Sequence, residues 1–107
     1  MSKINADSKF DSMQVITIGT SAGGLTVLIS LINQLPKDFP APILIVQHIS
    51  ADVSGNVLLN AINEIGKFIC SHAKQGELIK PGKIYLAPPD HHLMVNALGQ
   101  LQVTKGA

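Results

Sequence analysis

The stretch VITIGTSAGG, residues 15–24, decides the fold because it joins a strand to a helix through a turn of small residues. Apolar and β-branched residues run into Gly19, and leucine or isoleucine recurs at helical spacing from residue 25 until Pro36 ends the pattern. The stretch therefore predicts a strand over 13–18, a glycine-rich turn, and a helix over 24–35.

The rest of the chain continues this alternation of strands and helices. An uninterrupted apolar run, ILIVQ, is typical of a strand buried on both faces. The further elements that we expect are strands at 43–47, 68–70 and 83–86, a helix at 56–65, and a hairpin at 92–96 and 100–104. This order predicts an α/β fold with a doubly wound, Rossmann-like, mainly parallel sheet.

The predicted strands need apolar cover on two faces, yet right-handed crossovers put both predicted helices on the same face. One face of the sheet is therefore expected to be bare. We expect the chain to be part of a domain, with further helices supplied by a missing C-terminal half or by a partner.

Length and composition set the remaining bounds. The 107 residues suffice for one domain, and with 46% hydrophobic residues no apolar run reaches the ~18 residues of a membrane span. The polar segment 1–12 is expected to be a flexible terminus without the pattern of a secretory leader. A lone cysteine, Cys70, fits a reducing compartment, so the cytoplasm is the expected location. The net charge of +1, without a basic cluster, indicates no nucleic-acid partner.

The glycine-rich turn has two functional readings, a phosphate cradle and a nucleophile turn. The dinucleotide fingerprint needs a middle glycine where this chain has Ser21, and an acidic residue near the end of the second strand, where Gln47 and His48 stand. The Gly-Lys-Ser/Thr of a P-loop is also missing. Both phosphate readings are disfavoured, and we expect no cofactor.

The pattern Gly19-Thr20-Ser21-Ala22-Gly23 instead fits G-x-S-x-G, in which a serine sits on a sharp strand-to-helix turn. The following helix would point its N-terminus at the same place, so that the backbone N–H of Ala22 can receive an oxyanion. His48 follows the next strand, and the carboxyl ends of neighbouring parallel strands share one edge. We predict Ser21 as nucleophile and His48 as its base; a helix N-cap is the alternative role for the serine.

Three segments, IGTSAGG, PAPILIVQHIS and GELIKPGKIYLAPPDHHLMV, together resemble the catalytic domain of the CheB-type chemotaxis protein-glutamate methylesterases. The resemblance covers residues 14–103 and only the N-terminal half of that domain, so residues 13–107 are expected to be a truncated methylesterase domain. It implies a serine hydrolase that removes methyl esters from glutamyl residues of chemotaxis receptors. By matching residues, Ser21 would attack, His48 would move the proton, and Ala22 would mark the oxyanion site.

The chain also departs from that family. The family's third triad member is an aspartate in a segment that would lie beyond residue 107. Asp90 is a candidate stand-in, against a role in bracing the turn after residue 88. Loop 50–56 and the following helix lack family features of receptor recognition, and any receiver domain would belong to a separate chain. The alternative function is a catalytically impaired remnant or interaction module.

The remaining candidate ligands are four residues that match no established zinc spacing, namely Cys70, His72, His91 and His92. We expect no metal site. The histidines are expected to be surface or hydrogen-bonded side chains, and Cys70 a small buried residue.

Overall fold

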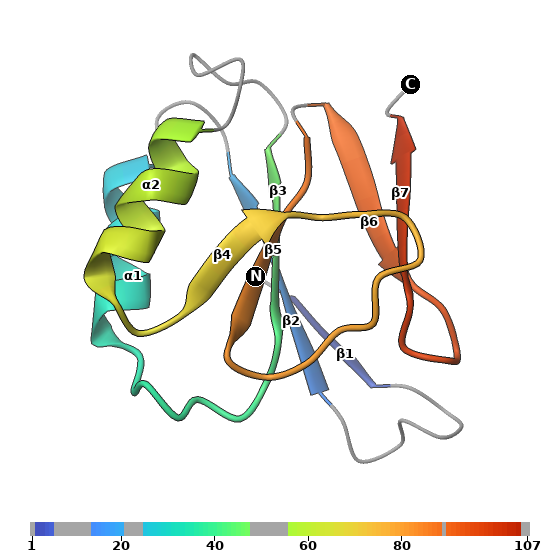
Figure 1. Cartoon of the computed structure of the whole chain (residues 1–107), viewed down its shortest axis with the longest axis horizontal. Coiled ribbons are helices and arrows are strands. Elements are labelled where there is room, and N and C mark those ends of the chain that lie inside the picture. Colours follow the sequence, from blue (N-terminus) through green and yellow to red (C-terminus); the bar gives the residue numbers. More distant parts are fainter. Residues whose placement is uncertain (1, 6–13, 21–24, 48–55, 89, 106–107) are drawn as a thin grey trace.

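A computed structural model describes residues 2–5, 14–20, 25–47, 56–88 and 90–105 of the chain. The described elements are β1 (Ser2–Asn5), β2 (Gln14–Thr20), α1 (Leu25–Gln34), β3 (Ile43–Gln47), α2 (Asn56–Ile65), β4 (Ile69–His72), β5 (Lys83–Leu86), β6 (His91–Val95) and β7 (Leu101–Lys105). Figure 1 shows the helices on one side of the central sheet and the β6–β7 hairpin on the other. Neither described helix is long and apolar enough to cross a membrane.

The central sheet has five strands in the order β1-β2-β3-β5-β4. Strands β2, β3, β5 and β4 run parallel to one another, and β1 is antiparallel to its neighbour β2. The strand ILIVQ is buried at every position, as its uninterrupted apolar run predicts for a strand covered on both faces. The predicted α/β fold with a mainly parallel sheet is confirmed; the predicted bounds of β3, α2 and β5 agree with the structure, and the ends of the other predicted elements shift by one or two residues.

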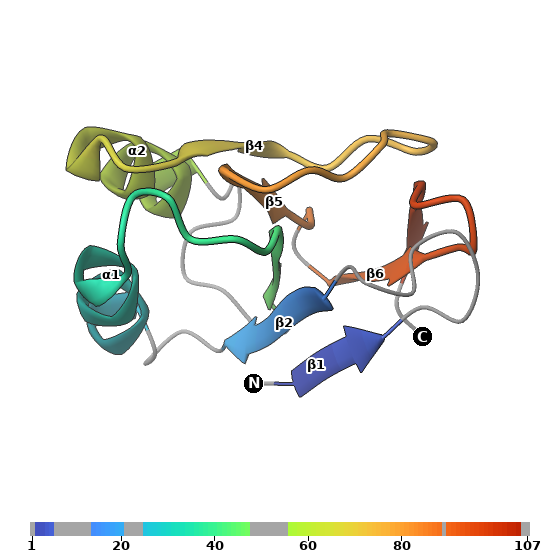
Figure 2. The ribbon, with the colours of Figure 1, turned by 90° about the horizontal axis from the view of Figure 1, so that it is seen from below.

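Both described helices pack on the same face of the sheet (Figure 2). Residues at alternate positions of β3, such as Ile43 and Ile45, join one apolar cluster with Leu28 and Ile32 of α1 and Ile62 of α2. This placement agrees with right-handed crossovers between strands that lie in one sheet.

The opposite face of the sheet is not bare, which corrects the sequence-based expectation. Leu44 and Tyr85 are fully buried there, in a second cluster that includes Leu93 of β6 and Leu101 of β7. The cover comes from the β6–β7 hairpin and from the connector at 73–82, which adds Ile79 to the cluster. Sequence reasoning counted only helices as cover, whereas here a hairpin that follows β5 folds back over the strands.

The N-terminal strand β1 lies within the segment that we expected to be flexible. It pairs antiparallel with β2 in the register Ser2↔Thr17 to Asn5↔Gln14. The edge of β2 offers unpaired backbone groups that a short segment can bond without an apolar side-chain pattern, so hydropathy gave no signal for it. Residues 1 and 6–12 of that segment lie outside the described residues.

Candidate functional site at the carboxyl ends of the strands

Ser21, Ala22 and His48, the predicted site residues, lie outside the described part of the chain. The residues that immediately precede two of them are described. Thr20 ends β2, Gln47 ends β3, and these two residues are register partners in the parallel pairing of the strands. The sheet therefore brings the ends of both strands to one edge, from which the chain continues into the predicted site.

Gln47 is the buried polar residue at this edge, with 5% of its surface exposed. It continues the alternation of Ile43 and Ile45, so it lies on the face of the sheet that the helices cover. Its side-chain Nε2 is buried and has no hydrogen-bond partner among the described residues.

A turn after β5 is attached to the same strand end. The backbone N–H of Asp90 donates to the carbonyl of Gln47 at 3.1 Å, and the N–H of His91 donates to the carbonyl of Pro88 at 3.0 Å. Asp90 has a positive φ of 62° and an exposed side chain, a backbone conformation that aspartate tolerates in turns. These contacts fit the turn role that the sequence suggested for Asp90, and its role as a triad acid stays a prediction.

His72 ends β4 at the same rim of the sheet, two strands away from β3. Its Nε2 lies 3.2 Å from Oδ1 of Asn56, the first residue of α2. This confirms the expectation of a hydrogen-bonded histidine at this position. In the described part of the chain, no three His, Cys, Asp or Glu residues are grouped so that they could hold a metal ion.

Cys70 is buried on the helix-covered face of β4, with 4% of its surface exposed. Burial raises the pKa of its thiol from 9.0 to about 12. Because the thiolate is the reactive form, this environment fits the expected role of a small core residue.

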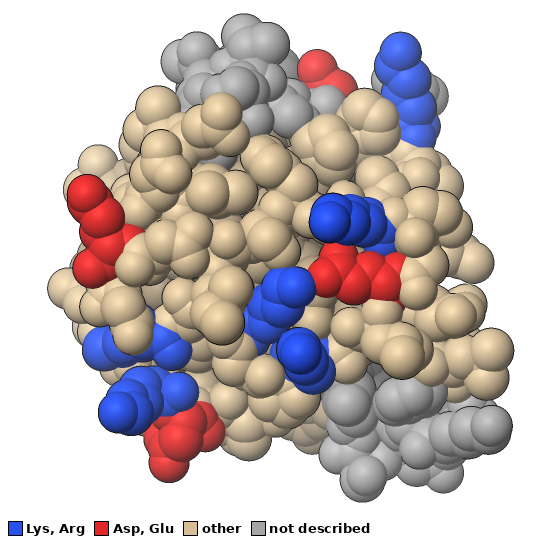
Figure 3. Space-filling view, in the orientation of Figure 1, with Lys and Arg blue, Asp and Glu red and all other residues tan. Residues whose placement is uncertain are grey.

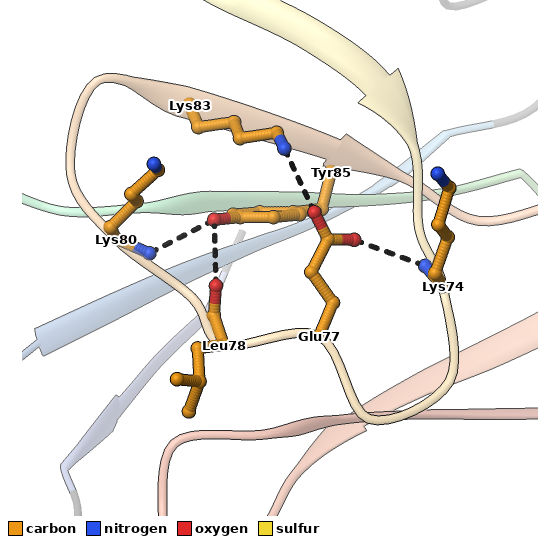
Figure 4. A network of polar contacts seen from close by, with 6 residues as sticks. All are labelled: Lys74, Glu77, Leu78, Lys80, Lys83 and Tyr85. Carbon is orange, nitrogen blue, oxygen red and sulfur yellow. Dashed lines mark hydrogen bonds and ion pairs between the residues drawn. The ribbon is translucent and has the colours of Figure 1, made fainter.

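The connector between β4 and β5 is fixed by polar contacts (Figure 4). The carboxylate of Glu77 accepts hydrogen bonds from the ammonium of Lys83 at 2.8 Å and from the backbone N–H of Lys74 at 3.1 Å. The bond to Glu77 raises the pKa of Lys83.

The hydroxyl of Tyr85 in β5 holds the connector by two hydrogen bonds. It accepts from the backbone N–H of Lys80 at 2.9 Å and donates to the carbonyl of Leu78 at 3.3 Å. The ring is fully buried, and burial raises the pKa of the hydroxyl. These contacts make the connector part of the cover of the sheet.

In the view of Figure 3, lysines and acidic residues are interspersed over the surface, with no broad tract of one charge.

Comparison with known proteins begins with the family match. Residues 16–107 match the CheB methylesterase family. A protein-glutamate methylesterase/protein-glutamine glutaminase of Halalkalibacterium halodurans is 45% identical over 85 residues, which are 79% of this chain and 24% of that protein. A protein of the same name, numbered 1, from Syntrophus aciditrophicus is 42% identical over 94 residues, 87% of this chain and 26% of that protein.

A solved structure gives the same assignment. The crystal structure of the Thermotoga maritima CheB methylesterase catalytic domain matches with a TM-score of 0.71 and 35% identity, over 86% of this chain and 49% of that one. The chain thus spans about a quarter of the length of these curated relatives and about half of the solved domain. Sequence and fold agree over most of the described strands and helices, and the chain belongs to the CheB methylesterase family.

Proposed function

We propose that this chain supplies the nucleophile and the base of a protein-glutamate methylesterase. Membership of the CheB methylesterase family supports the reaction class, and the relatives that match this chain are named protein-glutamate methylesterases. The proposed substrates are glutamyl methyl esters of chemotaxis receptors. The proposed location is the cytoplasm, with regulation through a receiver domain on a separate chain.

The observation that carries the assignment of residues is the register of β2 and β3. Thr20 and Gln47 are Cα partners in adjacent parallel strands. If that register continues by one residue, position 21 would lie opposite position 48, at the carboxyl ends of the strands, where α/β sheets bind ligands. A serine hydroxyl needs a base within hydrogen-bond reach to act as a nucleophile near neutral pH, and His48 is the residue that this register supplies.

The proposed reaction proceeds in two steps. Oγ of Ser21 attacks the ester carbonyl while His48 takes the hydroxyl proton. The backbone N–H of Ala22 stabilises, by a hydrogen bond, the negative charge that develops on the carbonyl oxygen. Collapse of this intermediate breaks the bond to the methoxy group, and His48 gives its proton to the departing methanol. Water, activated by the same imidazole, then hydrolyses the acyl-enzyme to a free glutamate carboxylate.

Reaction with a fluorophosphonate ester tests this assignment, because the attack of Oγ on phosphorus expels fluoride and leaves a stable adduct. We expect the adduct on Ser21 by peptide mass spectrometry, none in Ser21→Ala, and labelling at least ~100-fold slower in His48→Ala. His72→Ala is the matched control, because His72 also ends a strand at this rim. A wild-type chain that is not labelled, or a His48→Ala variant labelled at the wild-type rate, would contradict the proposal and favour an interaction module.

A further inference from the structure

The outer edge of β2 is only partly covered by its neighbour. Strands β3, β5 and β4 lie on one side of β2, and the short strand β1 lies on the other. β3 pairs with β2 as far as Thr20, whereas the pairing with β1 ends at Thr17. In the described part of the chain, residues 18–20 therefore have a strand partner on the β3 side only.

The direction of the backbone bonds shows which groups this leaves open. The N–H of Ile16 donates to the carbonyl of Pro42, just before β3, so by alternation the backbone groups of Thr17 and Gly19 point to the outer edge. Thr17 is the register partner of Ser2 in β1, but Gly19 has no partner in β1 and is exposed. The edge at Gly19 is therefore a template on which a further strand can pair.

The helix α1 adds an apolar flank beside this edge. Its ten residues include no charged side chain, and Val27 and Leu31, one turn apart, have 72% and 36% of their surfaces exposed. Ile29 is two residues from each, hence on the opposite flank, where it packs against the core cluster that α1 shares with α2. Val27 and Leu31 thus face away from α2, towards the β1 end of the sheet (Figure 2).

This flank can cover one more strand than it does with β2 and β3. A helix is about 10 Å wide and strands lie about 4.8 Å apart, so a helix that connects two neighbouring strands reaches the next position in the sheet. A strand in that position would have α1 on its helix-side face. Since α1 carries no charge, the side chains that such a strand turns towards it must be apolar.

A solved relative indicates what fills this position. The match covers 86% of this chain but only 49% of the Thermotoga maritima catalytic domain, so that domain has a second half beside the same strands. In doubly wound sheets the first strand of the pattern lies in the middle, and the strands of the second half add beyond its free edge. β1 does not belong to that pattern, because it is antiparallel and precedes the family match at residues 16–107.

We infer that the outer edge of β2 and the Val27–Leu31 flank of α1 form the docking surface for the second half of a methylesterase domain, and that β1 is a displaceable strand that covers part of this surface. The incoming strand starts at Gly19, where β1 leaves the edge open. Along the whole of β2 it pairs seven residues where β1 pairs four, which favours the exchange. This inference rests on the membership of the family and on the sheet, and does not depend on the roles proposed for Ser21 and His48.

The test uses a variant in which β1 cannot leave. Asn5 and Gln14 are register partners, and because the backbone bonds of this pairing fall at residues 15 and 17, their Cα atoms lie about 4.5 Å apart, within the reach of a disulfide. The probe is the second half of the Thermotoga maritima catalytic domain, produced as a tagged polypeptide together with the full chain carrying Asn5→Cys and Gln14→Cys. We expect it to retain the reduced chain and to lose the oxidised one, with the first half of its own domain as positive control.

Two further measurements separate the edge from the helix flank. Val27→Lys should abolish retention, whereas Thr26→Lys, at an exposed position of the same turn, should not. In the wild-type chain without the probe, the N–H of Thr17 should exchange with solvent at least ~10-fold faster than that of Ile16, because β1 opens locally while β3 does not.

Four results would overturn the inference. The probe could retain its own first half but not this chain, or it could bind the oxidised and reduced chains equally, which would place docking elsewhere. Equal exchange at Thr17 and Ile16 would mean that β1 leaves only when the whole fold opens. A dimer of the chain that oxidation abolishes would make a second copy the occupant. A chain that phosphonate does not label at Ser21 is a different result, because it removes the proposed function and leaves this inference standing.

Discussion

Asn63 gives the sharpest prediction about stability, because its side chain holds the outer edge of the sheet. Its Oδ1 accepts from the backbone N–H of Cys70 at 2.9 Å, and its Nδ2 donates to the carbonyl of the same residue at 3.0 Å. Cys70 belongs to β4, which ends the five-stranded sheet. The amide of a helical residue thus takes the place of a neighbouring strand at this edge.

Truncation in Asn63→Ala removes two hydrogen bonds and leaves two backbone groups of a buried residue without their partners. Each bond contributes about 1 kcal/mol, and because water can reach part of this edge the total loss should be about 2 kcal/mol. For a chain of this size, that loss corresponds to a fall in the unfolding midpoint of about 10 °C. Asn63→Asp should lose as much, because a carboxylate keeps the acceptor but faces the carbonyl of Cys70 without a proton.

Urea denaturation followed by circular dichroism measures the effect, with an unchanged m-value indicating that only stability has altered. Asn60→Ala is the matched control, since Asn60 is an exposed asparagine of the same helix. We expect the control to change stability by less than about 0.5 kcal/mol. Equal losses in the two variants would refute the reasoning, because the loss would then not depend on the contact with Cys70.

Three further predictions concern individual side chains. Burial raises the pKa of the Cys70 thiol from 9.0 to about 12, so above about pH 9 the folded chain keeps a proton that the unfolded chain loses. The stability that this proton contributes should be complete below about pH 9 and should fall as the pH rises towards about 12. Urea midpoints should show this decline in the wild type but not in Cys70→Ala. Lys67→Met removes an ammonium that donates to the carbonyls of Asn33 and Leu35 at the end of α1, and it should lower the free energy of unfolding by about 1 kcal/mol, against no change in the exposed-site control Lys37→Met. Tyr85→Phe leaves the N–H of Lys80 and the carbonyl of Leu78 without the hydroxyl, and it should cost about 1–2 kcal/mol in the same assay; an unchanged midpoint would mean that water replaces the hydroxyl.

The central strands and helices could be predicted from sequence because their signals are local. The run ILIVQ is apolar throughout, and the helical spacing over residues 56–65 is regular, so the expected bounds of both elements agree with the structure. The β2 turn pattern likewise gave a strand followed by a helix. In each case the hydrophobic period and the flanking glycine or proline point to the same element.

The features that sequence reasoning missed depend on contacts between distant segments. The second face is covered by a hairpin whose Leu93 and Leu101 pack against β3 and β5, and no local pattern says where a hairpin docks. The pairing of β1 uses backbone groups, which composition does not record. Gln47 did carry a signal, because it is the polar residue at the end of an apolar run, but only the structure shows that its Nε2 is buried and has no partner in the part of the chain that is described.

Disulfide trapping tests the central claim, that positions 21 and 48 meet at one edge of the sheet. Adjacent parallel strands lie about 4.8 Å apart, within the Cα separation of about 4.4–6.8 Å that a disulfide spans. Ser21→Cys with His48→Cys should therefore close rapidly under mild oxidation, seen as a cross-linked peptide by mass spectrometry. In the control pair Ser21→Cys with His72→Cys, three strand spacings, roughly 14 Å, separate β2 from β4 and should prevent closure. Rapid closure of the first pair alone is the predicted result; no closure at 21 and 48, or equal closure in both pairs, would contradict the account.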